Sequence, residues 1–316
     1  MTLRLGFLGT GDFAVPALKA LHAAGHELAL VICQPDRPRG RGHQLQAPPL
    51  KLAAQELGLT VFQPEKLRAP EALQVLLDAK LDLGCVVAYG QILPQAALDA
   101  PRLGCVNVHA SLLPRWRGAA PIEWALAAGD EATGVCVQRM VYKLDAGAVL
   151  LSQRRVLGPD DDAPKLHAEL AVSGAALLLQ ALQGLEQGSL QAVPQDEAGV
   201  TLAPLLKKSD GYIDLHAPRQ TVLNRFRAFK ARPGASVQVQ GGELLKVHAM
   251  ADAGPQGGEP GRLLECSHQG FKVACADGAV WLEQVQGPGA KAMAAEDYAR
   301  GHAVASNSCF IRPEGA

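Results

Sequence analysis

Short apolar runs alternate with amphipathic stretches through the first third of the chain. In chain order these runs and stretches are residues 3–9, 13–24, 28–33, 48–57, 70–79, 81–87 and 103–109. Nearly continuous hydrophobic strands are expected where helices cover both faces of a parallel sheet. The pattern therefore predicts an α/β fold with a Rossmann-like, mainly parallel sheet, and ligands bind such sheets beyond the carboxyl ends of the strands.

The rest of the chain is expected to complete this unit and to add a linker and a second domain. A hairpin is expected at residues 134–141 and 148–156, and one long helix at residues 163–187. We therefore expect the first domain to span residues 1–188. Residues 189–206 are polar, contain prolines and show no convincing periodicity, which is typical of a linker that runs over the surface.

Residues 207–316 have the pattern of a smaller β domain. A helix is expected at about 217–230, and glycine-rich turns separate the strands that follow it. These strands are expected at residues 235–240, 243–249, 261–266, 270–276 and 279–284. Short strands of this kind predict a C-terminal OB-like β-barrel.

Composition excludes some classes of protein but identifies no partner. Of the 316 residues 19% are charged and 48% are hydrophobic, which excludes intrinsic disorder, and a net charge of −1 indicates no particular ligand. The seven cysteines include no C-x-x-C pair, so we expect buried thiols in a reducing compartment and no metal site. We find no signal-peptide pattern and no apolar stretch near the roughly 20 residues of a membrane span, which predicts a cytoplasmic protein.

A loose form of the dinucleotide fingerprint, G-x-G-x-x-A, follows the first strand at residues 9–14. Such a turn presents backbone amides at the start of a helix, which suits a phosphate, but it also simply packs a helix on a sheet. The acidic residue that normally ends the second strand of a nicotinamide site is missing, because that strand ends Cys33-Gln34-Pro35. The motif favours a structural turn over nicotinamide binding.

Polar residues interrupt the strand at 103–109 where it ends. In an extended chain, residues two apart point to one side about 7 Å apart, so Asn107 and His109 should project together into the crevice where such sheets bind ligands. An amide donor that stabilises a developing oxyanion, beside an imidazole that moves protons, suits acyl transfer. The plain alternative is that Asn107 caps the strand and His109 is a satisfied, half-buried histidine.

Asp145 lies in the turn of the expected hairpin, directly before Ala146-Gly147. An aspartate close to a glycine in a hairpin is usually a turn former. The alternative role is to orient His109 or to favour its protonated form, and the pattern alone does not place the two side chains together.

The residues around this strand resemble the folate-dependent formyltransferases that act on methionyl-tRNA. The resemblance is carried by residues 107–122, by Leu144-Asp145-Ala146-Gly147, and by residues 9–14, 34–42 and 87–94, and it extends over nearly the whole chain. It implies a 10-formyltetrahydrofolate donor, initiator methionyl-tRNA as acceptor, direct formyl transfer without a metal, and a catalytic set of Asn107, His109 and Asp145. It also implies folate binding by Ser111, Leu112, Leu113, Pro114, Ala88, Tyr89, Gly90, Gln91, Ile92 and Leu93.

Two basic stretches are candidates for contact with tRNA phosphates. The resemblance implies that the loop of residues 36–51, with Arg37, Arg39 and Arg41, enters the acceptor stem, and that Arg41 is its key arginine. The second stretch, residues 207–232, contributes Lys207, Lys208 and Arg225. Here the chain departs from the family pattern, since Leu202 stands where an aromatic is expected and residues 230–234 replace a tryptophan-containing turn.

Other functions remain open from the sequence alone. The same catalytic motif is compatible with a formyltransferase or hydrolase that acts on a small amine, such as an amino sugar, or on water. An RNA-binding module without activity and a nicotinamide dehydrogenase are further alternatives. We expect a monomer that binds no membrane.

Overall fold

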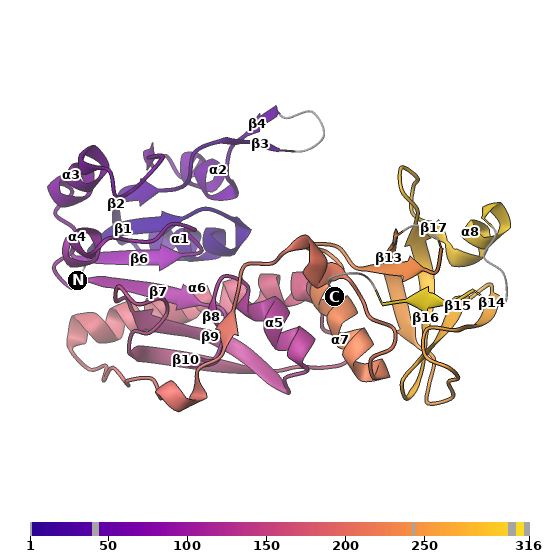
Figure 1. Cartoon of the computed structure of the whole chain (residues 1–316). Coiled ribbons are helices and arrows are strands. Elements are labelled where there is room, and N and C mark those ends of the chain that lie inside the picture. The colour runs from indigo at the N-terminus through magenta and orange to yellow at the C-terminus, as the bar shows by residue number, and fades with distance from the viewer. Residues whose placement is uncertain (1, 40–43, 242–243, 303–307, 313–316) are drawn as a thin grey trace. The chain divides into compact units, whose positions relative to one another are not determined.

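The computed structural model describes residues 2–39, 44–241, 244–302 and 308–312, and the chain divides into two compact units. Unit 1 contains Met1–Pro121, Ala132–Val156 and Lys165–Ala203, and unit 2 contains Ile122–Glu131, Leu157–Pro164 and Pro204–Ala316. Figure 1 follows the chain through both units.

A seven-stranded, mostly parallel sheet forms the centre of unit 1, in the order β10-β9-β7-β6-β1-β2-β5. Its strands are β1 (Arg4–Gly9), β2 (Glu27–Ile32), β5 (Val61–Phe62), β6 (Leu83–Val87), β7 (Cys105–His109), β9 (Ala132–Arg139) and β10 (Val149–Val156). All neighbours pair in parallel except β9, which runs antiparallel to both β7 and β10. The expected α/β class with a mainly parallel sheet is confirmed.

Helices cover the two faces of this sheet. They are η1 (Asp12–Ala14), α1 (Val15–Ala23), α2 (Pro49–Glu56), α3 (Pro70–Asp78), α4 (Gln95–Asp99) and α6 (Ala163–Gln187). Proline stands in the first turn of α1, α2 and α3, where its missing N–H costs no hydrogen bond. Leu8, Ile32 and Val86 point to the face where α3 and α4 pack. The opposite face carries α6, because Gly174 of that helix approaches Val108 and Val135.

α6 is the one helix in the described part of the chain that is long and apolar enough to cross a membrane, by length and composition only. It has 25 residues, and its most apolar 18-residue segment has a mean hydropathy of 1.3 and is half buried within the structure. Burial of that segment against the sheet is the ordinary cause of such a composition in a core helix.

Smaller elements surround the carboxyl edge of the sheet. A hairpin of β3 (Arg37–Arg39) and β4 (Gln44–Gln46) follows β2, and β8 (Arg117–Gly118) pairs in parallel with β11 (Leu202–Ala203). The segment from residue 189 to η2 (Glu197–Gly199) and β11 belongs to unit 1, where Val193 forms a bridge with Val149. Its polar, aperiodic sequence therefore makes specific backbone contacts.

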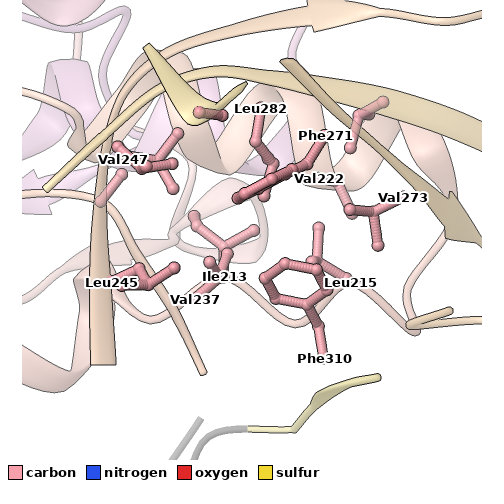
Figure 2. Packing of buried hydrophobic residues seen from close by; sticks show 14 of the residues in the cluster. Ile213, Leu215, Val222, Val237, Leu245, Val247, Phe271, Val273, Leu282 and Phe310 are labelled. Atoms are coloured by element: carbon pink, nitrogen blue, oxygen red, sulfur yellow. The ribbon is translucent and has the colours of Figure 1, made fainter. Parts of the chain in front are cut away.

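Unit 2 has an antiparallel sheet in the order β14-β15-β16-β13-β12-β18, with β17 paired to β16. Its elements are η3 (Lys208–Gly211), α7 (Arg219–Phe229), β12 (Ser236–Val239), β13 (Leu244–Asp252), β14 (Leu263–Ser267), β15 (Gly270–Cys275), β16 (Gly278–Gln286), β17 (Met293–Ala294), α8 (Ala295–Gly301) and β18 (Phe310–Ile311). Figure 2 shows Val222 of α7 packed among Val247, Phe271 and Leu282 of this sheet. The expected β-barrel domain is present as an antiparallel half-barrel closed by a helix.

α5 (Pro121–Ala128) lies mostly within unit 2, although the residues that precede it in sequence belong to unit 1. The indole of Trp124 meets the ring of Phe229 edge-on, with ring centroids 5.6 Å apart, and its Nε1 donates to the carbonyl of Pro204 at 2.9 Å. This aromatic contact joins α5 to α7 inside the unit.

The packing of α6 on the sheet depends on a glycine. A Cβ on Gly174 would lie 2.7 Å from Cγ1 of Val108 and 3.2 Å from Cγ2 of Val135, both buried. Gly174→Ala should lower the free energy of unfolding by about 1 kcal/mol, because overpacking of about 1–3 kcal/mol exceeds the gain of about 1 kcal/mol in helix propensity. Urea denaturation measures this difference.

The control is Gly301→Ala in the helix α8, where an added Cβ would meet no atom within 4 Å. This variant should be as stable as the parent protein or more so. Equal destabilisation of both variants would contradict the assigned contact.

Candidate active site

The catalytic candidates Asn107 and His109 lie on β7, two residues apart and on the same face of the sheet. Cys105, on that same face, packs into the cluster beneath α3 and α4, whereas Val108 points to α6. Asn107 pairs with Val86 of β6 and with Gln138 of β9, and His109 pairs with Cys136. The structure therefore brings the amide and the imidazole to one side at the carboxyl end of β7.

The two side chains differ in their surroundings. Asn107 is partly exposed, and within the described residues its amide group makes no hydrogen bond. His109 is only 5% exposed, and its Nε2 lies 2.9 Å from the carbonyl oxygen of Trp116. Because a carbonyl only accepts, Nε2 must be the donor, which leaves Nδ1 facing the carboxylate of Asp145 at 3.7 Å.

Asp145 reaches His109 from the connection between β9 and β10. Its backbone has a positive φ of 45°, a conformation that L-residues rarely adopt. One carboxylate oxygen accepts from the backbone N–H of Gly118 at 2.9 Å, and the other accepts from Nε2 of Gln138 at 3.0 Å. These two donors orient the carboxylate, so the structure places Asp145 beside His109.

The loop after β7 is bound to residues 201–203. The N–H of Trp116 donates to Oγ1 of Thr201 at 2.8 Å, and the N–H of Arg117 donates to the carbonyl of Thr201 at 2.9 Å. Gly118 has a φ of 127°, and a side chain there would collide with the backbone of Ala203. This positive φ explains why glycine is needed where the loop turns back towards Asp145. Leu202, which stands where the family pattern has an aromatic, is 67% exposed on β11.

The segment after β6, a folate candidate, alternates between exposed and buried residues. Ala88 and Gly90 are exposed with positive φ, and Ile92 is 76% exposed, so these residues are accessible to a ligand. Tyr89 is buried, burial raises the pKa of its hydroxyl to about 12, and its carbonyl accepts from Oγ1 of Thr10 at 2.8 Å. Leu93 is buried as well.

The other folate candidates are Gln91, which also follows β6, and residues 111–114, which follow β7. The amide of Gln91 is held by the N–H of Leu67 and the carbonyl of Glu65, so it acts within the fold. Ser111 is fully buried and donates to the carbonyl of Arg115 at 2.7 Å. Leu112, Leu113 and Pro114 are half-buried, and Leu112 contacts Gly134 of β9 on the face that carries His109.

The basic candidates of unit 1 lie on the β3–β4 hairpin. Arg37 is exposed and pairs with Glu65 at 2.6 Å, Arg39 ends β3, and Arg41 lies outside the described residues. Thr10, Gln34, Arg37 and Gln46 line an open pocket of about 210 Å³ at the base of this hairpin, together with prolines. Among the described side chains of this hairpin, Arg37 thus presents a positive charge after the carboxyl end of β2.

The basic candidates of unit 2 have unequal environments. Lys207 and Lys208 are exposed at the start of η3. Arg225 turns inward, where it donates to the carbonyl of Asp210 at 2.8 Å and lies over the ring of Phe229, and burial lowers the pKa of its guanidinium. The described contacts of Arg225 are therefore contacts within the unit.

Cysteines and metal ligands add no second candidate site. Five cysteines are buried, but Cys266 is exposed and Cys309 is intermediate, so the expectation of seven buried thiols is wrong for these two, which lie at the edge strand β14 and beside β18. No cluster of three or more His, Cys, Asp or Glu side chains able to hold a metal occurs in the part of the chain that is described.

Two glutamines near Asp145 were not singled out from the sequence. Gln138 is 1% exposed within the apolar strand β9, so a polar residue in a buried strand was an available signal. Gln195 donates to the carbonyls of Asp145 and Gly147 from a segment without periodicity, and no local pattern marks it.

Comparisons with known proteins agree with this geometry. Residues 3–182 match the formyl transferase family and residues 205–303 match the formyl transferase C-terminal domain. The chain is 48% identical over 304 residues to the methionyl-tRNA formyltransferase of Acidiphilium cryptum, covering 96% of this chain and 98% of that one. It is 47% identical over 304 residues to that of Neisseria gonorrhoeae, with the same coverage. This chain belongs to the methionyl-tRNA formyltransferase family.

Solved structures with lower identity share the fold of this formyltransferase. An N-formyltransferase from Helicobacter canadensis, in complex with folinic acid and dTDP-3-aminofucose, superposes with a TM-score of 0.67 at 14% identity, covering 88% of this chain and 98% of that one. HypX from Aquifex aeolicus in complex with tetrahydrofolic acid has a TM-score of 0.65 at 18% identity, covering 94% of this chain and 47% of that one.

The turn at residues 9–14 packs tightly at one glycine and is open at the other. A Cβ on Gly9 would lie 2.7 Å from Cβ of Ala14 and 2.8 Å from the carbonyl oxygen of Val87, whereas a Cβ on Gly11 would meet no atom within 4 Å. Gly9→Ala should therefore lower the free energy of unfolding by about 1–3 kcal/mol, and Gly11→Ala should change it little. Thermal or urea unfolding of the two variants measures this difference, and a large loss for Gly11→Ala would contradict the structural role of the turn.

Proposed function

We propose that this enzyme transfers the formyl group of 10-formyltetrahydrofolate to the amino group of methionyl initiator tRNA, with Asn107, His109 and Asp145 as its catalytic residues. The observation that carries the proposal is the end of β7, where an amide without a partner among the described residues and a histidine facing a carboxylate share one face of the sheet. The proposal gives each of these groups a separate task.

Asn107 is the donor to the formyl oxygen. When the methionine amine, in its neutral form, attacks the formyl carbon, a C–N bond forms and the carbonyl oxygen gains negative charge. An amide N–H that already lies at the site, and that no protein group uses, stabilises this charge without reorganisation. The tetrahedral intermediate then collapses with cleavage of the bond to the folate nitrogen, and tetrahydrofolate leaves.

His109 moves the protons, and Asp145 orients it. Nε2 is held by the carbonyl of Trp116, which fixes the plane of the ring, so Nδ1 is the nitrogen beside the carboxylate at 3.7 Å. The amine loses a proton as the C–N bond forms and the folate nitrogen gains one as its bond breaks, and an imidazole serves both steps.

The donor would lie along the carboxyl ends of β6 and β7. Ala88, Gly90 and Ile92 are exposed after β6, and Leu112, Leu113 and Pro114 are half-buried after β7. We assign the same ligand to the neighbouring Tyr89, Gln91, Leu93 and Ser111, which support the two segments from within the fold. Structures of tetrahydrofolic acid bound to HypX and of folinic acid bound to the Helicobacter canadensis enzyme support a folate in this fold.

The tRNA would contact basic residues of both units. In unit 1 these are Arg37, Arg39 and Arg41 of the hairpin region, and in unit 2 they are Lys207 and Lys208, with Arg225 beside them. We assign tRNA binding to residues 207–316 and the chemistry to residues 1–188, joined by residues 189–206. The enzyme acts as a cytoplasmic monomer in this proposal. The identity of 47–48% to methionyl-tRNA formyltransferases over nearly the full chain favours tRNA over an amino sugar as acceptor.

Replacement of the two β7 residues tests the chemistry. Asn107→Ala should lower kcat by about 10²–10³-fold because one oxyanion donor is lost, and His109→Ala by about 10²–10⁴-fold because proton transfer is lost. The measurement is formation of N-formylmethionyl-tRNA from 10-formyltetrahydrofolate and charged initiator tRNA.

The control for this experiment is His22→Ala, which removes an exposed imidazole at the end of α1 and should leave kcat unchanged. If Asn107→Ala and His109→Ala both retain the activity of the parent enzyme, these residues are not catalytic.

Replacement of Arg41 tests the acceptor. Arg41→Ala should abolish most formylation of methionyl-tRNA while binding of the folate donor is kept, and the slope of log K for tRNA against log salt should fall by about one unit. Filter binding at several salt concentrations gives this slope.

The matched control is Lys19→Ala, which removes one exposed positive charge from α1 outside the hairpin. Equal effects of the two substitutions would mean that only the overall charge matters and would refute the role of Arg41.

A further inference from the structure

The side-chain amide of Gln195 binds two backbone carbonyl groups of the turn that carries Asp145. Its Nε2 donates to the carbonyl of Asp145 at 2.8 Å and to the carbonyl of Gly147 at 2.7 Å, which uses both of its N–H bonds. A longer contact of 3.4 Å reaches Oε1 of Gln138, and Nε2 of Gln138 donates to the Asp145 carboxylate. One side chain from a distant segment thus binds the backbone of this turn.

A buried arginine determines which way the Gln195 amide points. Nε of Arg117 donates to Oε1 of Gln195 at 3.0 Å. If the amide were reversed, its N–H groups would face a guanidinium and its oxygen would face two carbonyl oxygens, so that all three contacts would be repulsive. The observed orientation is therefore the only one that satisfies the network.

The guanidinium of Arg117 is itself held in place by an ion pair. Arg117 is 4% exposed, and its guanidinium also pairs with Glu197 at 2.9 Å, while Glu197 pairs with Lys143 at 3.0 Å. The hydrogen bond from Arg117 is the largest cause that lowers the pKa of Glu197, so this carboxylate keeps its charge at neutral pH. A charged side chain is rarely buried without such compensation.

The turn needs this support because it has an unusual backbone conformation at Asp145 and no room for a side chain at Gly147. Asp145 has a φ of 45°, and a side chain at Gly147 would collide with the carbonyl of Arg139. Strained conformations persist at functional sites only where the surroundings hold them. In the described structure, the Gln195 amide binds the turn at both of these residues.

We propose that Gln195, oriented by Arg117, is a positioning residue that holds the Asp145 carboxylate against His109 during formyl transfer. This inference rests on the proposed function of Asp145. It gives the segment between the two predicted domains an indirect part in catalysis. Residues 195–197 contact no reacting atom, and they act by holding the turn at residues 143–147.

The test replaces the amide by a group of the same shape that cannot donate. In Gln195→Glu a carboxylate faces the two carbonyl oxygens, so the turn should shift and kcat for formylation of methionyl-tRNA should fall by about 10²-fold, the effect of misplacing a catalytic group by about 1 Å. KM for both substrates should stay close to that of the parent enzyme. Gln191→Glu is the matched control, because it makes the same chemical change at an exposed position four residues away and should leave kcat unchanged.

A double substitution separates positioning from a general structural effect. Once Asp145 is replaced in Asp145→Asn, the turn has no carboxylate to hold, so adding Gln195→Glu should lower single-turnover rates no further. Losses that multiply in the double variant would overturn the proposal. So would a Gln195→Glu enzyme with the kcat of the parent.

Two further measurements keep the test decisive. Amide hydrogen exchange at residues 143–147 should accelerate in Gln195→Glu while exchange in β12–β16 stays the same, and this readout needs no activity. Arg117→Lys keeps the charge beside Glu197 but cannot donate from Nε, so it should lower kcat in the same direction if Gln195→Glu does not fold. An inactive parent enzyme would refute the proposed function, whereas unchanged exchange in the turn would refute the role of Gln195.

Discussion

The pairing of β7 with β9 is the constraint on which the site depends. The central sheet is parallel as far as β7, and β9 then runs the opposite way beside it. This antiparallel neighbour places Gln138 opposite Asn107 and Cys136 opposite His109, so that β9 ends beside the start of β7. The connection that follows β9 places the Asp145 carboxylate on Nε2 of Gln138 and 3.7 Å from Nδ1 of His109. The pairing register of β9 on β7 thus allows a short connection to bring Asp145 to His109.

Donors and acceptors around His109 and Asp145 are paired with one another. This pairing fixes one arrangement of the side chains and makes it sensitive to a change at any one of them. Trp116 offers a carbonyl to His109, Gly118 offers an N–H to Asp145, and β11 fixes the loop that contains both. In a buried network each unsatisfied group costs its full desolvation, so a change at one member affects the others. Asn107 departs from this rule among the described catalytic candidates, since its amide has no protein partner there, and among the folate candidates the buried hydroxyl of Tyr89 has none either.

Charge is organised locally although the whole chain is almost neutral. The net charge of −1 hides a basic hairpin after β2 and exposed lysines at the start of η3. Some basic residues are used inside the fold instead, as with Arg225 over Phe229 and Arg117 beside Gln195. Counting basic residues along a stretch therefore overestimates the number available to phosphates, because part of them satisfies buried carbonyls and carboxylates.

The pattern of the sequence was enough to determine the α/β class and the positions of the main strands and helices, because hydrophobic periodicity is a local property. It also determined the face shared by Asn107 and His109, because side chains two apart in a strand point the same way. Only the tertiary structure decided that Asp145 faces His109, that Gln138 and Gln195 bind the Asp145 turn, and that residues 189–203 belong to the first unit. These contacts join residues 7 to 50 positions apart, across strand register and loop closure. No local period encodes such a contact, since it depends on where the whole sheet brings two segments together.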